Sequence, residues 1–240
     1  MSQPNATPPS APPRIGVRAV VRLLAAIAIL PLILFLCAGR WDWWQGWVYV
    51  GLGLFFTFAS RLILLRLNPS LITERAHSLD AKDTKPWDRV LVPIITMFGP
   101  LVVWIVAGLD RRWSWSAPLS PALLVAAIVV LVLSYALATW AMLVNTFFSG
   151  TVRIQKERGH TVISSGPYRY VRHPGYVGGL LANLAVPFVL GSLWALIPSL
   201  ALVALTILRT ALEDRTLQEE LPGYKDYAQR TRYRLLPGVW

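Results

Sequence analysis

Two polar segments in the C-terminal third of the chain contain the residues whose types and spacing could carry out chemistry. The first, residues 153–176, holds two histidines, three tyrosines and five cationic side chains. Its Gly166-Pro167 and His173-Pro174-Gly175 sequences break the regular backbone and leave N–H and C=O groups that need partners. Aromatic rings for stacking and main-chain groups for hydrogen bonds suit an adenosine-like ligand. We therefore predict a ligand cavity here, with structural histidines as the alternative.

The second polar segment, residues 209–220, continues an apolar helix. Arg209 and Glu213 are four residues apart, so they lie on one face of that helix. One interpretation is a local ion pair at the membrane boundary, which contributes only a few tenths of a kcal/mol. The other is that Glu213 points into the bundle and binds a cationic group of a ligand. The spacing alone slightly favours the local pair.

Long apolar spans must position these two segments. Of the 240 residues, 55% are hydrophobic and 15% are charged, whereas a soluble domain carries about 25% charged residues. A helix needs about 20 apolar residues to cross the hydrocarbon core of a bilayer. The sequence predicts four such spans, at residues 17–39, 47–67, 90–109 and 121–148.

A fifth apolar region, residues 177–208, is too long for one ordinary span. Pro187, Gly191, Ser192 and Pro198 interrupt it, which predicts a helix–turn–helix hairpin that turns near Gly191. The predicted fold is an all-α, polytopic helical membrane bundle with four spans and a C-terminal helix–turn–helix hairpin. The hairpin should bring the two polar segments together.

The sequence predicts that the chain is divided into three parts. Residues 1–13 are rich in Pro, Ser and uncharged polar residues and are predicted to be a disordered tail. Residues 14–120 should form the N-terminal transmembrane helices. Residues 121–240 should form a core that contains both polar segments, the hairpin and a cytoplasmic C-terminal tail.

The basic residues indicate the orientation. Arg14, Arg18 and Arg22 flank the first span, and the segment 149–176 carries five cationic residues against one acid. Positive residues favour the cytoplasmic side, and the hairpin returns residues 209–240 to that side. We therefore expect a multi-pass protein whose active site faces the cytoplasm, in the cell inner membrane if the source is bacterial.

The net charge is +11. The basic residues that produce it lie beside the spans, so they indicate membrane topology and not a nucleic-acid partner. Cys37 is the single cysteine, which excludes a disulfide within the chain, and no metal site is predicted. No obligate protein partner is evident. Tryptophans at the outer end of the second predicted span indicate an aromatic belt, with a ligand cage as the alternative; they are Trp41, Trp43, Trp44 and Trp47.

The first polar segment resembles a family signature. Gly166-Pro-Tyr-Arg-Tyr-Val-Arg-His-Pro-Gly-Tyr176 is similar to the Gly-x-Tyr…Arg-His-Pro-x-Tyr pattern of isoprenylcysteine carboxyl methyltransferases and their phospholipid methyltransferase relatives. The resemblance continues through Arg209…Glu213-Asp214. It ends in Leu221-Pro-Gly-Tyr-Lys-Asp-Tyr227 and Arg234-Leu-Leu-Pro-Gly238. It covers about residues 140–240 and is specific to the superfamily, but weak on the substrate.

The resemblance implies S-adenosylmethionine as the cofactor and a methyltransferase core in residues 121–240. It implies catalytic roles for Arg209, which would face the substrate, and Glu213, which would bind the positively charged end of the cofactor. Asp214 stands where the family usually has a second Glu and is expected to be a supporting residue. The remaining cofactor-binding residues that the resemblance implies are Gln155, His160, Thr161, Val162, Ile163, Tyr168, His173, Pro174, Gly175 and Tyr176.

The predicted reaction is methyl transfer to a lipid-like or lipid-anchored acceptor that arrives from the bilayer lipids. A carboxylate acceptor, the first choice, is ionised at neutral pH and needs no general base, and Arg209 would orient it. An amine acceptor, as in a phospholipid N-methyltransferase, must lose a proton to His173, Glu213 or water.

Two further functions are compatible with a membrane bundle of this kind. One is a membrane sterol-type reductase that uses NADPH. The second is a non-catalytic transporter or scaffold, in which Arg61 or Arg209 would line a path through the membrane. Neither of these two functions requires a methyl donor, so binding of S-adenosylmethionine distinguishes them from a methyltransferase.

Overall fold

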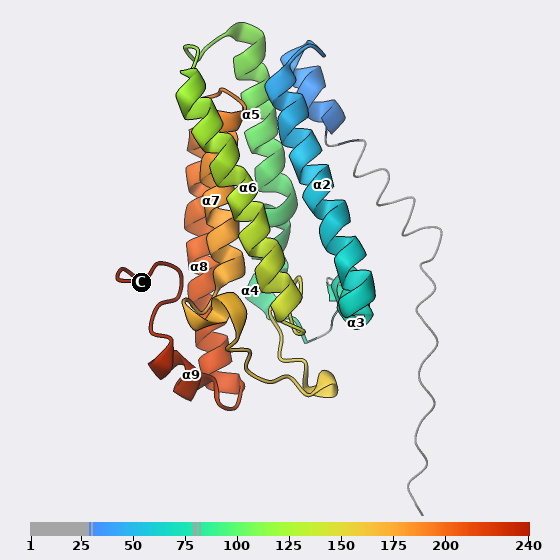
Figure 1. Ribbon diagram of the computed structural model, residues 1–240, viewed down its shortest axis with the longest axis vertical. Coiled ribbons are helices and arrows are strands. Elements are labelled where there is room, and N and C mark those ends of the chain that lie inside the picture. The colour runs from blue at the N-terminus through green and yellow to red at the C-terminus, as the bar shows by residue number, and fades with distance from the viewer. Residues whose placement is uncertain (1–28, 30, 79–80, 82) are drawn as a thin grey trace, which may run out of the picture.

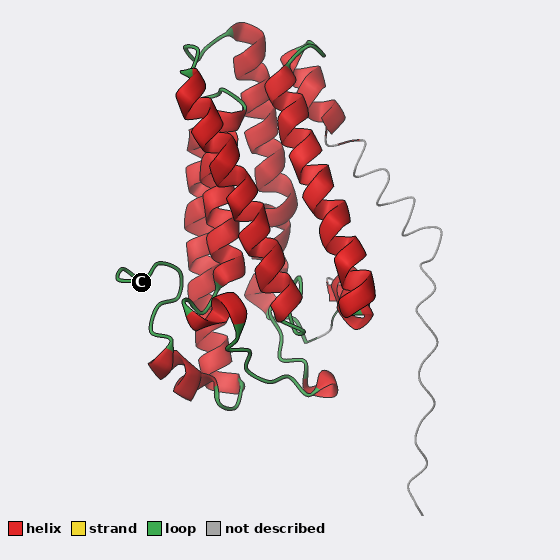
Figure 2. Ribbon diagram, in the orientation of Figure 1, coloured by secondary structure: helices red, strands yellow, loops and turns green. Residues whose placement is uncertain are grey.

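The computed structural model describes residues 29, 31–78, 81 and 83–240, and every regular element in this part of the chain is a helix (Figure 1 and Figure 2). The predicted disordered tail and most of the first predicted span, residues 17–39, lie outside the described residues. Residues 31–38 at the end of that span are helical. The prediction of an all-α membrane bundle is confirmed.

Four helices of the described chain are long and apolar enough to cross a membrane. Three of them correspond to predicted spans, and the fourth is the second arm of the predicted hairpin. They are α2 (Trp44–Leu67), the continuous helix Pro86–Trp113, α6 (Pro121–Val144) and α8 (Leu196–Glu220).

The span Pro86–Trp113 has three segments, α4 (Pro86–Pro93), the π-helix η2 (Ile94–Phe98) and α5 (Gly99–Trp113). In the middle segment the Gly99 N–H bonds to the carbonyl of Ile94, five residues back. Pro100 has no N–H to offer the carbonyl four residues before it, which explains why the α-helical pattern is lost here. Single π-turns of this kind occur often at functional sites.

The α6 helix ends at Val144, four residues before the end of the predicted span. Asn145 turns the chain, because its side-chain oxygen accepts a hydrogen bond from the Phe147 N–H at 2.9 Å. The chain then forms a loop as far as His173, which contains two short 3-10 helices, η3 (Lys156–Arg158) and η4 (Gly166–Arg169). Because the chain leaves the α6 axis at Asn145, this loop lies beside the ends of the other helices.

The predicted hairpin is present, with α7 (Pro174–Val189) and α8 packed together. Gly191 lies in the turn with φ of +70°, a conformation that favours glycine. The α7 helix also packs closely on α6. A Cβ atom at Gly178 would lie 2.6 Å from the carbonyl oxygen of Ser134, so the absence of a side chain permits this approach.

Two short helices, α3 (Pro69–His77) and α9 (Tyr224–Arg230), were not predicted. Asn68 caps α3, because its side-chain oxygen accepts from the Leu71 N–H at 3.3 Å. Both helices lie at the end of the bundle where the loop of residues 145–173 and the end of α8 are found (Figure 1). The two polar segments therefore share one end of the molecule.

Candidate active site

A cavity of about 780 Å³ opens at the polar end of the bundle. Its wall is formed by α2, α3, α4–η2, α6, α7, α8, the loop of residues 145–173 and the tyrosines of α9. Ten of the predicted site residues line it: His160, Thr161, Val162, Ile163, Tyr168, His173, Gly175, Tyr176, Arg209 and Glu213. Gln155 and Pro174 are outside its lining.

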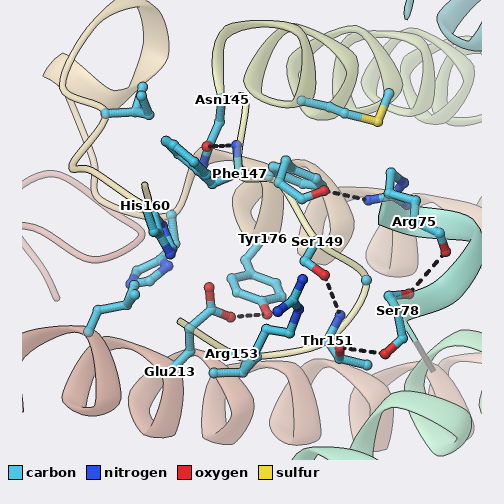
Figure 3. A pocket seen from close by; sticks show the side chains of 18 of the residues that line it. Arg75, Ser78, Asn145, Phe147, Ser149, Thr151, Arg153, His160, Tyr176 and Glu213 are labelled. Carbon is cyan, nitrogen blue, oxygen red and sulfur yellow. Dashed lines mark hydrogen bonds between the residues drawn. The ribbon is translucent and has the colours of Figure 1, made fainter. Parts of the chain in front are cut away.

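Glu213 and Tyr176 point toward each other from α8 and α7 (Figure 3). The Tyr176 hydroxyl donates to Oε2 of Glu213 at 2.5 Å. The other carboxylate oxygen, Oε1, accepts no hydrogen bond from the described part of the chain. Glu213 thus presents a negative charge and an available oxygen to the cavity, which suits a cationic group of a ligand.

Arg209 does not form the local pair with Glu213 that the spacing slightly favoured. Its Nε and Nη2 atoms donate to the two carboxylate oxygens of Asp88 at 2.7 and 3.1 Å. Nη2 also donates to the Gly150 carbonyl at 3.2 Å, and the guanidinium lies 5.3 Å from the centre of the Tyr176 ring. The Arg209 side chain is therefore held in one orientation at the cavity wall.

Asp88, at the start of α4, was not identified from the sequence. Its side chain is fully buried, and Oδ2 also accepts from the Val152 N–H at 2.6 Å. Arg209, the loop and α4 thereby meet at one carboxylate. The sequence does show an acid beside an apolar span at this position. Its partner, Arg209, is 121 residues away, so no local pattern identifies the pair.

Asp214 is fully buried. Arg172 donates to both of its oxygens at 2.7 and 3.0 Å, and His173 Nε2 lies 3.1 Å from Oδ1. Arg234 and Tyr224 donate to the same carboxylate at 2.8 and 3.1 Å. This single carboxylate therefore joins α8 to the Arg-His-Pro sequence, to α9 and to the C-terminal segment.

His160 stacks on Phe147, with ring centres 4.5 Å apart. Its Nδ1 accepts from the Gln155 N–H at 3.3 Å, which leaves Nε2 as the protonated ring nitrogen. Burial, and then the positive charges of Arg158 and Arg153, lower the pKa of His160 to about 4. His160 is therefore a neutral hydrogen-bond donor at pH 7.

Gln155 is fully buried behind the cavity wall. Its amide nitrogen donates to the Phe147 carbonyl at 2.8 Å, and its amide oxygen accepts from Arg158. Both ends of the side chain are thus engaged in shaping the loop. The structure places Gln155 as support for His160 and Phe147.

Arg153 attaches the same loop to the rest of the protein. Its guanidinium pairs with Glu74 of α3 at 2.7 Å, with Asp83 at 3.0 Å and with Glu157 at 2.7 Å. Tyr168 is fixed from α9, because the Tyr227 hydroxyl donates to its carbonyl at 2.7 Å. The loop is irregular in shape, but it is held at several points.

The comparisons with known proteins concern this same region. Residues 125–220 match the sequence model of the isoprenylcysteine carboxyl methyltransferase (ICMT) family. The match contains α7, α8 and every predicted site residue from Gln155 to Glu213, so the matched region includes a large part of the cavity wall. This part of the chain is therefore similar to the ICMT family, and the match covers less than half of the chain.

A curated relative extends the comparison. The cobalt-zinc-cadmium resistance protein CzcN of Cupriavidus metallidurans is 37% identical over 86 residues. The aligned region is 32% of this chain and 37% of the relative, so the chain matches little more than a third of that protein's length. Within the described residues, no group of three or more His, Cys, Asp or Glu side chains is arranged to hold a metal ion.

Proposed function

We propose that the protein transfers a methyl group from S-adenosylmethionine to the carboxylate of a lipid-like or lipid-anchored acceptor. The observation that carries this proposal is the position of Glu213. It is the one acidic residue among the described residues that line the cavity, and Tyr176 holds it there. An acid in this place can bind the positively charged end of the cofactor.

The residues present fit this cofactor. The cavity volume of about 780 Å³ is in the usual range for small-molecule sites. The main-chain N–H groups of residues 161–163 donate no hydrogen bond to the described part of the chain, and these residues line the cavity. They can bind the polar edge of an adenine ring beside Phe147 and His160. Glu213 is available for the opposite, cationic end.

When bound, S-adenosylmethionine supplies a methyl carbon that is activated by a positively charged sulfur. The acceptor oxygen forms a bond to that carbon while the carbon–sulfur bond breaks, and the sulfur keeps the electron pair. The protein must hold the reacting atoms in line and exclude water. The immobilised Arg209 guanidinium can orient the acceptor carboxylate, because Nη1 makes no hydrogen bond within the described residues.

A carboxylate acceptor makes fewer demands on the site than an amine acceptor. An amine needs a base to take its proton. His173 Nε2 is engaged with Asp214 and lies 3.4 Å from the Tyr224 hydroxyl. The low pKa of His160 makes it a weak base. A carboxylate acceptor needs neither residue as a base.

The proposed side of the membrane follows from charge. The basic segment of residues 149–176 contributes to the cavity wall, and positive residues favour the cytoplasmic side. The soluble cofactor would then arrive from the cytoplasm, and the acceptor from the bilayer.

Calorimetry on the purified protein tests cofactor use. We expect S-adenosylmethionine to bind, and Glu213→Gln to weaken this binding at least about tenfold through loss of a charged partner. Glu219→Gln, an exposed acid on the same helix that pairs with Arg215, is the matched control and should bind normally. Binding of NADPH in place of S-adenosylmethionine would contradict the proposal and favour the reductase.

A further inference from the structure

Five arginines line the cavity: Arg61, Arg75, Arg153, Arg172 and Arg209. Acids neutralise the last three. Arg153 pairs with Glu74, Asp83 and Glu157, Arg172 pairs with Asp214, and Arg209 pairs with Asp88. In the described part of the chain, no acid pairs with Arg61 or Arg75. Two uncompensated cations therefore lie in the wall of one cavity.

Arg75 and Arg61 both line that cavity. The Arg75 Nη1 atom donates to the Phe148 carbonyl at 3.3 Å, and its guanidinium lies 5.4 Å from the centre of the Phe148 ring. Desolvation by the surrounding protein, and then the charges of Arg61 and Arg209, lower the pKa of Arg75. Its side chain nevertheless remains accessible, because it faces the cavity. The positive charges of Arg61 and Arg209 thus both act on the Arg75 guanidinium.

Apolar side chains line the cavity together with Arg61. Ser60 and Arg61 of α2 lie three and four residues after Thr57, and Leu64 follows them by four and three, so the four residues share one helix face. Met97 of η2 and Met142 of α6 also line the cavity. Methionine side chains adapt to the shape of a flexible ligand. A cavity with apolar side chains and unpaired arginines suits an apolar chain with a charged head group.

We infer that Arg61 and Arg75 form a subsite for an anionic head group, and that this subsite selects an acceptor with a carboxylate at the end of an apolar chain. The inference rests on the proposed function and adds the residues that recognise the acceptor. Arg61 and Arg75 attract the carboxylate from the bilayer side, and Arg209 receives it at the reaction centre. A carboxylate is also part of S-adenosylmethionine, so the test must separate these two sources.

The probes are hexadecanoate and hexadecylamine, which share a chain and differ in head-group charge. Their binding is measured with the full-length protein in phosphatidylcholine nanodiscs, at a pH where the carboxylate is ionised, with empty nanodiscs subtracted. Binding of S-adenosylmethionine is measured on the same samples. The wild-type protein should bind hexadecanoate and discriminate against hexadecylamine. Equal binding of the two probes would overturn the inference, and this comparison requires no variant to fold.

The variants Arg61→Gln and Arg75→Gln should each weaken hexadecanoate binding by about tenfold, since each removes one charge-assisted contact. Arg61→Lys should retain most of the binding. Arg66→Gln is the matched control, because Arg66 is also on α2 but does not line the cavity, and it should bind hexadecanoate normally. Unchanged hexadecanoate binding in both Gln variants would overturn the inference. Variants that keep hexadecanoate binding but lose affinity for S-adenosylmethionine would also overturn it, because the two arginines would then bind the cofactor.

The two proposals fail differently. A wild-type protein that does not bind S-adenosylmethionine, but binds hexadecanoate through Arg61 and Arg75, would contradict the proposed methyl transfer and leave the anion subsite standing.

Discussion

Arg209 of α8 and Asp88 of α4 form a two-bonded ion pair at the cavity wall, with N–O distances of 2.7 and 3.1 Å. The pair joins the first residues of one span to the polar end of the hairpin. It explains how a long cationic side chain can serve as a fixed part of a site. Part of the N-terminal region thus has a direct role in positioning the C-terminal core.

Removal of the Asp88 charge should damage both stability and function. Asp88→Asn leaves the Arg209 charge buried without its partner, which costs about 3–5 kcal/mol in comparable buried pairs. We expect a lower free energy of unfolding in detergent and a raised KM for the acceptor. Asp42→Asn is the control, since Asp42 pairs with Arg40 in an exposed site at the opposite end, and it should leave both quantities unchanged. A stable Asp88→Asn protein with normal KM would contradict the positioning role.

Asp214 should be the most sensitive acid at the polar end. Asp214→Asn removes the charge that Arg172, His173 and Arg234 share. The segment before α7 and the C-terminal segment should then loosen together, with a fall in Tm and in S-adenosylmethionine affinity. Asp226→Asn, an exposed acid of α9, is the comparison and should behave as wild type. Equal Tm values for the two variants would show that Asp214 does not join these segments.

His160 predicts a pH dependence of stability. Its folded-state pKa of about 4 is below its ordinary value of 6.5, so between these values the unfolded chain binds a proton that the folded protein does not. Its contribution to stability is complete above pH 6.5 and is lost as the pH falls toward 4. We expect Tm to decrease over this range more steeply in the wild type than in His160→Gln. Parallel curves for the two proteins would contradict the partly buried, neutral state of His160.

Gly178 should be the critical glycine of the α6–α7 contact. Gly178→Ala places a Cβ atom 2.6 Å from the Ser134 carbonyl, and overpacking of this kind usually costs about 1–3 kcal/mol. The adjacent Gly179 has no atom within 4 Å of an added Cβ, so Gly179→Ala should be neutral or slightly stabilising. Thermal unfolding of the two variants measures the difference. A Gly178→Ala protein as stable as Gly179→Ala would mean that the two helices can separate at no cost.

The spans could be predicted from the sequence because length and hydropathy decide them locally. The start of α2 was predicted within three residues of Trp44, and the hairpin turn was predicted near Gly191, where the structure has it. The helices α3 and α9 were missed because they are short and polar. Their stability comes from contacts such as the Tyr227–Tyr168 hydrogen bond, which a local pattern does not show.

The site was predictable where a motif is continuous along the chain. The sequence from Gly166 to Tyr176 and the pair Arg209 and Glu213 were expected to meet, and the structure brings their residues into one cavity. The partner of Arg209 could not be predicted, because Asp88 is distant in sequence and its burial depends on packing. The same limit applies to Gln155, which the signature suggested as a ligand contact and the structure places behind the wall.

The most direct test follows the methyl group. Membranes containing the protein are incubated with S-adenosylmethionine labelled in its methyl group, and both the lipid extract and the remaining membrane protein are treated with alkali. We predict label in one of these fractions that alkali releases as methanol, as expected for a carboxyl methyl ester, and its loss in Glu213→Gln but not in Glu219→Gln. Absence of label with a folded protein, or label that is stable to alkali, would contradict methyl transfer to a carboxylate.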